Sequence, residues 1–263
     1  AWTDQYLGMK QANVFPSNAA LGLPAISAVY LLSSAQTGQP LALMNGEALT
    51  ERRTAAASAL AADYLARKDA KTLLMVGTGA LAPSIIAAHC AVRPSIERVT
   101  IWGRNPDKAQ AVADKLGSEA VAGSPSLEVV TSIEAAVPQA DVISCATLAA
   151  EPLIKGAWLR PGTHLDLIGA FRSDMFETDV EAVSRAQVFI DMPVAIAESG
   201  ELQNAIAAGA FQASDVQADL KALTTGMHTG RADADAITLH KNVGNGLVDL
   251  YAAILAYERL AQA

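Results

Sequence analysis

A glycine-rich turn between an apolar strand and an apolar helix most limits what this chain can fold into. Residues 72–76 form a largely apolar run, which is typical of a strand buried on both faces of a sheet. The turn Gly77-Thr78-Gly79-Ala80-Leu81-Ala82 follows, and an apolar helix is predicted over residues 81–92. Gly77 permits a tight turn, Gly79 lets the backbone approach a pyrophosphate, and Ala82 permits close packing of helix on sheet. Together with the free N–H groups of the helix N-terminus, this pattern predicts a dinucleotide-binding loop rather than an ordinary strand-to-helix turn.

Further strand-like runs alternate with helical segments along the chain. Strands are predicted at residues 98–102, 141–145, 164–168 and 187–191, and helices at residues 107–116 and 243–260. Such alternation is typical of an α/β protein with a Rossmann-type, doubly wound parallel sheet. Ahead of it, residues 7–43 predict short strands and turns, with one strand at residues 26–32. Thr50 is expected to cap an Ala-rich helix over residues 54–68.

The tip of the second predicted strand bears on the choice of nucleotide. Sites for NAD usually place Asp or Glu there, where it binds the ribose 2′-hydroxyl. Here the tip reads Trp102-Gly103-Arg104-Asn105, with no acid. Gly103 leaves room, Arg104 can pair with a 2′-phosphate, and Lys108 can assist. We therefore expect NADPH/NADP, with weaker use of NAD; the alternative is that Arg104 is a solvated surface residue.

Composition excludes several classes of partner. The formal net charge is −8 and Lys and Arg do not cluster, which argues against a nucleic-acid-binding surface. No apolar run approaches the ~20 residues of a membrane span, and no signal peptide is expected. Cys90 and Cys145 lie in apolar runs, so we expect buried free thiols and a reducing, cytoplasmic location. The four histidines show no metal-ligand spacing, and no metal is expected.

Short motifs follow one another in a definite order along nearly the whole chain. They are Lys10; Phe15-Pro16-x-Asn18; Gly22-Leu23-Pro24; Thr37-Gly38-x-Pro40; Leu49-Thr50-x-x-Arg53-Thr54-Ala55-Ala56; the Gly77 loop; Gly162-Thr163-His164; Ile168-Gly169-Ala170; and Thr238-x-x-Lys241-x-Val243-Gly244 with Asp249. In that order they resemble the ornithine cyclodeaminase and mu-crystallin family. The Arg-Thr-Ala-Ala run and the Gly22 region are fairly specific to it, whereas the Gly77 loop is not.

The resemblance implies a homodimer of two-domain subunits. Residues 1–68 with 241–263 would form a smaller α+β domain for substrate binding and dimerisation, and residues 69–240 would form the Rossmann domain that binds NADP(H). Family members usually carry a further N-terminal segment. Because this chain begins at Ala1 without a Met, we expect residues ahead of it, and one substrate-binding Arg of the family is expected there.

The resemblance also assigns site residues. Arg53 would hold a substrate carboxylate through a bidentate pair, and Lys10 would add a second positive charge near the carboxylate or a ring nitrogen. From the residues alone, plainer alternatives are favoured, namely a surface lysine and a helix-surface ion pair. The substrate pocket would include Asn18. Further cofactor contacts are implied at Thr54, Thr147, Asn242, Val243 and Gly244.

Phe171 separates two activities within the family. In its cyclodeaminases a catalytic Asp follows the Gly-Gly or Gly-Ala at the end of this strand, and deamination needs such a base. Phe171 cannot accept a proton, but it could form a wall of the substrate pocket against a flat ring. The sub-group with a non-acid here resembles the ketimine reductases. We therefore expect NADPH-dependent reduction of a cyclic ketimine carboxylate, Δ1-pyrroline-2-carboxylate or Δ1-piperideine-2-carboxylate, to proline or pipecolate.

Other readings stay open. If Phe171 is a core aromatic, then Asp166, Asp174 or Glu177 could serve as the acid. The chain would then be an ornithine cyclodeaminase or an NAD(P)-dependent amino-acid dehydrogenase. A third reading is a mu-crystallin-like NADPH-binding protein without turnover.

Overall fold

The computed structural model describes residues 1–23 and 26–261, and the chain divides into two compact units. The small unit comprises Ala1–Thr54 and Gly244–Ala263, and the large unit comprises Ala55–Val243. The predicted boundaries at residues 68 and 241 differ from this division, because residues 55–65 of helix α1 (Gly46–Leu65) pack into the large core. Pro24, part of one family-like motif, lies outside the described residues.

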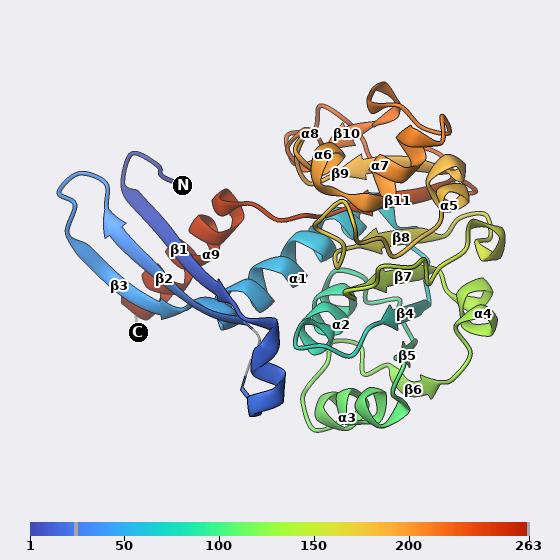
Figure 1. The fold of residues 1–263 in the computed structure, drawn as a ribbon, viewed down its shortest axis with the longest axis horizontal. Coiled ribbons are helices and arrows are strands. Elements are labelled where there is room, and N and C mark those ends of the chain that lie inside the picture. The colour runs from blue at the N-terminus through green and yellow to red at the C-terminus, as the bar shows by residue number, and fades with distance from the viewer. Residues whose placement is uncertain (24–25, 262–263) are drawn as a thin grey trace. The chain divides into compact units, whose positions relative to one another are not determined.

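Within its described residues, the large unit forms an eight-stranded sheet in which neighbouring strands run parallel (Figure 1). The strand order is β10-β9-β11-β8-β7-β4-β5-β6. The strands are β4 (Thr72–Val76), β5 (Arg98–Trp102), β6 (Ser126–Val130), β7 (Val142–Cys145), β8 (His164–Leu167), β9 (Ala186–Ile190), β10 (Ala218–Asp219) and β11 (Ile237–Lys241). The predicted Rossmann-type α/β fold is confirmed.

Strands β6, β10 and β11 were not predicted. Strand β6 is an edge strand without fully buried residues, and its sequence, Ser-Leu-Glu-Val-Val, is not a continuous apolar run. Strand β11 is buried along its whole length yet reads Ile-Thr-Leu-His-Lys. Its polar side chains find partners inside the protein, which an apolar pattern cannot reveal.

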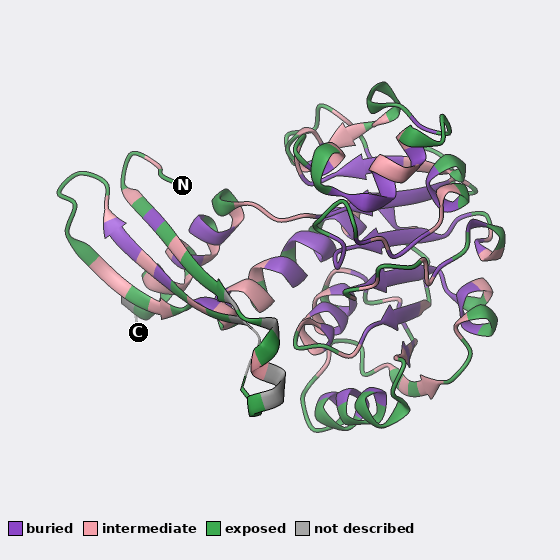
Figure 2. Ribbon diagram, in the orientation of Figure 1, coloured by how far each residue is buried: buried purple, intermediate pink, exposed green. Residues whose placement is uncertain are grey.

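Helices cover both faces of this sheet. Helices α2 (Leu81–Val92) and α3 (Pro106–Gly117) pack with residues 55–65 of α1 on one face. The other face is covered by α4 (Ile133–Ala136), α5 (Val180–Arg185), α6 (Ala195–Glu198) and α7 (Gly200–Ala207). A further helix, α8 (Leu220–Thr224), packs near β9. Figure 2 shows the central strands buried between these layers. No helix in the described part of the chain is long and apolar enough to cross a membrane.

The strand order reverses beside β4. From β4 the chain adds β5 and β6 on one side, and it then returns to add β7 and β8 on the other. The loops after β4 and β7 therefore meet at the carboxyl edge of the sheet. Gly77 N donates to Trp102 O at 3.0 Å, and Ala146 N donates to Val76 O at 2.9 Å. Ligands of open α/β sheets bind in the crevice at such a switch point.

The small unit is an antiparallel sheet that packs against α9 and the first part of α1. Among its described residues are β1 (Tyr6–Val14), the 3-10 helix η1 (Pro16–Leu21), β2 (Ile26–Ser34), β3 (Pro40–Asn45) and α9 (Gly246–Ala261). Tyr30 and Leu32 of β2 pack with Leu250 and Ala253 of α9 to form its core. The two faces of this sheet therefore differ, one being packed against α9.

Helix α1 begins earlier than predicted. The Asn45 side chain accepts a hydrogen bond from Ala48 N at 2.9 Å, so Asn45 satisfies one of the first N–H groups. Thr50 lies inside the helix, where its hydroxyl donates to Gly46 O at 2.7 Å. The predicted N-cap at Thr50 is therefore wrong.

Helix α9 begins later than predicted, at Gly246 instead of Val243. Gly244 has a φ of +80°, which is outside the right-handed helical region. The Asn245 side chain then accepts hydrogen bonds from Leu247 N and Val248 N at 3.0 and 3.1 Å. These contacts fix the start of the helix.

Candidate functional site

The glycine-rich loop leaves open space at the carboxyl end of β4. Gly77 has a φ of +118°, and a Cβ there would lie 2.6 Å from Ala146 O, so the turn requires glycine. A Cβ on Gly79 would meet no described atom within 4 Å. The packing of the chain therefore does not require glycine at residue 79, whereas close approach by a pyrophosphate would. Ala82 is buried between helix and sheet, as the fingerprint predicts.

The N-terminus of α2 has no side-chain cap. Ala80 occupies the N-cap position, and no side chain accepts a hydrogen bond there. Within the described residues, the N–H groups of Thr78, Gly79, Ala80 and Leu81 donate to no acceptor. Free N–H groups at the positive end of a helix dipole suit a diphosphate. The loop thus fits the diphosphate of a dinucleotide.

The glycine-rich loop packs against the residue that follows β5. A Cβ on Gly103 would lie 2.6 Å from Thr78 Cγ2, so the Thr78 side chain can pass only because residue 103 is glycine. Arg104 and Lys108 are exposed, and neither side chain pairs with a described residue. Asn105 has a structural task, because its side chain accepts from Asp107 N at 2.9 Å and caps α3.

The loops after β7 and β8 are joined by one buried carboxylate. Glu177 Oε1 accepts hydrogen bonds from Thr147 N at 2.7 Å and from Thr147 Oγ1 at 2.8 Å. Glu177 Oε2 accepts from Gly169 N at 2.8 Å. Burial raises the pKa of Glu177 to about 7, although Lys241 nearby lowers it. The predicted cofactor residue Thr147 is therefore held by Glu177.

The segment that leads into α9 is less open than predicted. Asn242 is only 2% exposed, and its Nδ2 donates to Ser58 Oγ at 3.3 Å. Thr54 is also buried. Val243 is partly exposed, and its N–H donates to Asp191 Oδ2 at 3.2 Å. The Asn242 amide is thus used within the protein, so the exposed part of this segment begins at Val243.

Phe171 lies beyond the end of β8 and is 45% exposed, so the alternative of a core aromatic is wrong. The acids named as alternatives are all engaged. Asp174 is exposed and pairs with Arg172 Nε at 2.9 Å. Asp166 and Glu177 are completely buried. None of these carboxylates is placed as a free base beside Phe171.

Asp166 is the centre of a polar cluster under α2. Ser144 Oγ donates to Asp166 Oδ2 at 2.7 Å, and His89 Nε2 lies 3.3 Å from the same oxygen. His240 Nδ1 lies 3.4 Å from Oδ1. Burial would raise the pKa of Asp166, but hydrogen bonds from His240 and His89 outweigh it and hold that pKa well below its usual range. This cluster fixes neighbouring strands.

The two cations predicted to bind substrate lie together in the small unit. Lys10 Nζ is 2.7 Å from Asp249 Oδ2, and Arg53 Nε is 2.8 Å from Asp249 Oδ1. Their side chains are only 22% and 11% exposed, so neither is an ordinary surface residue. Two cations share one carboxylate, which leaves one net positive charge. Arg53 Nη1 and Nη2 pair with no described residue and remain available to a carboxylate.

Gly244 and Asn18 are the remaining predicted site residues of the small unit. A Cβ on Gly244 would lie within 3.1 Å of Arg53 Nη2, so the guanidinium packs directly on the Gly244 backbone. Asn18 lies in η1 and is partly exposed, and its N–H donates to Phe15 O at 3.0 Å. The site roles of both residues stay predictions.

Several residues of these networks were missed as functional candidates. Glu201 and Lys241 are completely buried, with Lys241 Nζ 3.3 Å from Glu201 Oε2. In the sequence, Asp249 and Lys241 were named only as members of a family motif, without a role. Glu177 was named only as an alternative catalytic acid. The sequence offered one indication of their roles: each of these charged residues stands beside apolar residues. Such a position suggests burial, and a buried charge requires a partner.

The cysteines are free and buried, as predicted. Burial raises the pKa of the Cys90 thiol to about 11, and it raises the pKa of the Cys145 thiol well above its usual value. Within residues 1–23 and 26–261, no group of three or more His, Cys, Asp or Glu side chains could hold a metal ion.

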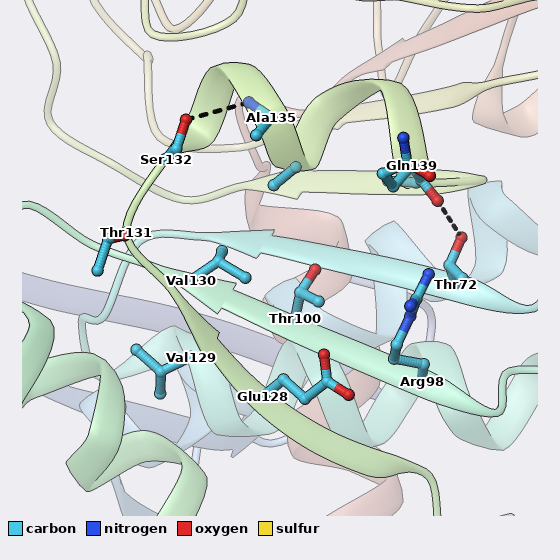
Figure 3. Close-up of a pocket in the computed structure, with 12 residues that line it drawn as sticks. Thr72, Arg98, Thr100, Glu128, Val129, Val130, Thr131, Ser132, Ala135 and Gln139 are labelled. Atoms are coloured by element: carbon cyan, nitrogen blue, oxygen red, sulfur yellow. Dashed lines mark hydrogen bonds between the residues drawn. The ribbon is translucent and has the colours of Figure 1, made fainter.

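A groove of about 440 Å³ lies over β4, β5 and β6 (Figure 3). Arg98, Thr100 and Glu128 line it from the strands, and α4 borders it. It exists because only short helices connect β6 to β7 and leave these polar residues uncovered. It includes no residue of the glycine-rich loop, so it is separate from the predicted cofactor site.

Comparison with known proteins decides the family. The model of the ornithine cyclodeaminase/mu-crystallin family matches residues 1–263. This chain belongs to that family. It is 43% identical over 248 residues to the Δ1-pyrroline-2-carboxylate reductase of Paracoccus denitrificans, which covers 94% of this chain and 77% of the relative.

Solved structures of family relatives are similar in fold. The Δ1-pyrroline-2-carboxylate reductase of Thermococcus litoralis, in complex with NADH and L-proline, is 34% identical with a TM-score of 0.91, covering 97% of this chain and 78% of that one. An archaeal alanine dehydrogenase dimer with bound NAD is 30% identical with a TM-score of 0.90, covering 98% and 78%. The predicted resemblance to the family and its ketimine reductases is confirmed. The prediction of a nicotinamide-dependent oxidoreductase acting on C=N bonds agrees with the names of the reductases.

Proposed function

We propose that this family member reduces the C=N bond of a cyclic ketimine carboxylate, Δ1-pyrroline-2-carboxylate or Δ1-piperideine-2-carboxylate or both, to proline or pipecolate. The observation that carries the proposal is Phe171, an exposed ring where the family resemblance expects the acid of a deaminase. Deamination needs a positioned base, whereas a cyclic iminium is already an electrophile. The similarity to named Δ1-pyrroline-2-carboxylate reductases supports the same choice.

The residues of the chain bind and polarise the substrate. A bound nicotinamide dinucleotide supplies the hydride. Arg53 Nη1 and Nη2 hold the substrate carboxylate, while Asp249 fixes the Nε side of the guanidinium. Lys10, held by the other oxygen of Asp249, keeps a positive charge and a proton near the carboxylate or the ring nitrogen. Phe171 offers a flat apolar wall for the ring. Most of the rate enhancement then comes from positioning and charge placement.

NADPH is the proposed cofactor, with NADH used less well. The support is the tip of β5, where Arg104 and Lys108 are exposed and unpaired among the described residues. Both can approach a 2′-phosphate, and no acid stands at the tip to bind a free 2′-hydroxyl. The relatives with bound NADH and NAD make NADH a necessary comparison.

The deciding experiment follows NADPH oxidation at 340 nm with each cyclic imine, with NADH in parallel. Turnover of either imine with preference for NADPH is the expected result. Release of ammonia from ornithine without imine reduction would favour the cyclodeaminase, and oxidative deamination of another amino acid would favour a dehydrogenase. NADPH binding with none of these activities would favour a binding protein.

A homodimer is the proposed assembly. On the face of the small sheet opposite α9, Leu7, Met9, Val29 and Leu43 are 44–74% exposed. A contiguous apolar face of this kind marks an interaction surface. Light scattering of the wild type and of Leu43→Lys tests it, because the charge should yield monomers. The two buried free thiols support the proposed cytoplasmic location.

A further inference from the structure

Three loops at the carboxyl edge of the large sheet meet at Thr147. A Cβ on Gly169 would lie 1.8 Å from Thr147 O, so the loops after β7 and β8 touch through their backbones. A Cβ on Gly77 would lie 3.2 Å from Thr147 Cγ2, so the glycine-rich loop lies against the other side. The loop after β8 therefore contacts the Thr147 backbone, whereas the glycine-rich loop lies only beside the Thr147 methyl group.

The Glu177 carboxylate holds the loops after β7 and β8 together. Its two carboxylate oxygens accept from Thr147 N, Thr147 Oγ1 and Gly169 N, and the side chain is completely buried. A carboxylate that accepts several hydrogen bonds in a buried place is a strong and directional restraint. None of its oxygens faces solvent, so it cannot contact a ligand directly.

A second carboxylate supports Glu177 from behind. Glu177 N donates to Glu201 Oε1 at 2.8 Å, and Glu201 Oε2 accepts from Ser199 Oγ at 2.8 Å. Lys241 of β11 lies 3.3 Å from the same Glu201 oxygen, so the charge of Glu201 is balanced. The segment that carries Glu177 is thus tied to α7 and β11, which belong to the large sheet and its helix layer.

The strand order indicates which part of a dinucleotide this meeting point borders. The diphosphate binds at the N-terminus of α2, and the adenosine ribose binds at the tip of β5. Strands β7 and β8 lie on the opposite side of β4 from β5. The other half of the dinucleotide, which carries the nicotinamide, therefore extends toward the loops after β7 and β8.

We propose that Glu177 is a positioning residue for the nicotinamide half of the cofactor, acting through Thr147 and Gly169 without touching the ligand. This inference rests on the proposed function, because it requires a nicotinamide dinucleotide at the glycine-rich loop. Loss of the Glu177 carboxylate frees the two loops that border the nicotinamide, and it leaves the diphosphate and adenosine contacts in place.

The ionisation of Glu177 adds a pH dependence. Burial raises its pKa to about 7, and the charged groups that face it are Lys241 of β11 and Glu201 of α7, while the Cys145 thiol of β7 stays protonated. The neutral carboxyl has a hydroxyl where the carboxylate accepts an N–H group, so one loop bond is lost as pH falls through 7. The affinity for the nicotinamide half therefore falls in acid.

The experiment compares NAD+ with ADP-ribose, which lacks the nicotinamide. Dissociation constants are measured by calorimetry for wild type, Glu177→Gln and the matched control Glu181→Gln, an exposed residue of α5. Glu177→Gln should bind NAD+ about tenfold more weakly, as expected for one lost charge-assisted hydrogen bond, and ADP-ribose within twofold of wild type. Glu181→Gln should change neither affinity. NAD+ is preferred over NADP+ because the 2′-phosphate itself titrates near pH 6.

Equal weakening of NAD+ and ADP-ribose would overturn the inference, since a merely structural role disturbs the whole site. Unchanged affinity for both ligands would also overturn it.

If Glu177→Gln does not fold, the wild type still decides. NAD+ should bind to it about fivefold more weakly at pH 6 than at pH 8, with the affinity for ADP-ribose unchanged. Parallel pH profiles for the two ligands would contradict the inference. If the wild type binds neither NAD+ nor NADP+, the proposed function is overturned as well. If the wild type reduces a cyclic imine and Glu177→Gln has unchanged affinity for NAD+, the inference alone is overturned.

Discussion

In the large unit the carboxylates of Asp166 and Glu177 are completely buried and accept from neighbouring donors, whereas in the small unit Asp249 lies between two partly exposed cations. The large unit therefore uses these buried charges to fix strands and loops, and its glycine-rich loop offers ligands uncharged N–H groups. In the small unit, the cluster of Lys10, Arg53 and Asp249 keeps one positive charge in excess, as an anion-binding site requires. The difference teaches that substitutions of the buried carboxylates in the large unit should act on stability and loop position, whereas substitutions of the small-unit cations should act on substrate binding and catalysis.

The largest effect is expected for Arg53→Ala. Removal of the guanidinium should lower kcat/KM by about 3 kcal/mol, on the order of a hundredfold, because a paired carboxylate loses its partner. NADPH affinity should be retained. The neighbouring, exposed Arg52→Ala is the matched control and should be silent in steady-state kinetics. Unchanged turnover in Arg53→Ala would remove Arg53 from the site.

Asp166→Asn should act in the opposite way. It removes a buried charge that binds Ser144, His89 and His240, so the free energy of unfolding should fall by about 2 kcal/mol. Urea denaturation measures this, with exposed Asp174→Asn as the control. Activity per folded molecule should persist. A stable but inactive Asp166→Asn would break the contrast between the units.

Acid should destabilise the large unit through His164. Burial holds the pKa of His164 well below its usual 6.5, so the charged form is disfavoured in the folded state. Its contribution to stability is present above pH 6.5 and is lost as pH falls, by up to about 1.4 kcal/mol per pH unit. Urea titrations at pH 7.5, 6.5 and 5.5 should show a steeper loss for wild type than for His164→Asn. Identical slopes would show that His164 does not titrate in this way.

Arg104→Ala should have a smaller and selective effect. Loss of an exposed charge beside a 2′-phosphate should weaken NADPH by about 1 kcal/mol, or about fivefold, and leave NADH nearly unchanged. Fluorescence titration with both cofactors measures the difference, and exposed Lys115→Ala is the control. Equal weakening of both cofactors would contradict the assignment to the 2′-phosphate.

The smallest effect on stability is expected for Phe171→Asp. Because Phe171 is 45% exposed, the free energy of unfolding should change by no more than about 0.5 kcal/mol. Thermal unfolding measures this, while imine reduction should fall because the apolar wall is lost. A strongly destabilised variant would mean that the ring packs more firmly than its exposure indicates.

Sequence alone could predict the features that depend on neighbouring residues. The Gly77 loop is one example, because strand, turn and helix follow within a short segment. It could not predict Glu177 as a restraint, because the donors at Thr147 and Gly169 come from loops after two different strands. The cap predicted at Thr50 is wrong because the sequence does not show where β3 ends, and the end of β3 places Asn45 at the start of the helix.

Strands with polar residues could not be predicted from the sequence for a related reason. Strand β11 contains Thr238, His240 and Lys241, which a one-dimensional pattern assigns to the surface. Their partners, His164, Asp166 and Glu201, come from distant segments and become visible only in the folded sheet. The pairing of Lys10 and Arg53 through Asp249 was likewise outside the reach of spacing arguments.

The positions of the two cysteines have a practical consequence. Cys90 belongs to the core under α2, and Cys145 belongs to the core on the opposite sheet face. Both thiols are buried and have raised pKa values, so a disulfide reagent reaches either one only when its own layer opens. Thiol-exchange kinetics on Cys90→Ala and Cys145→Ala variants would then time the opening of each layer separately, with no label introduced.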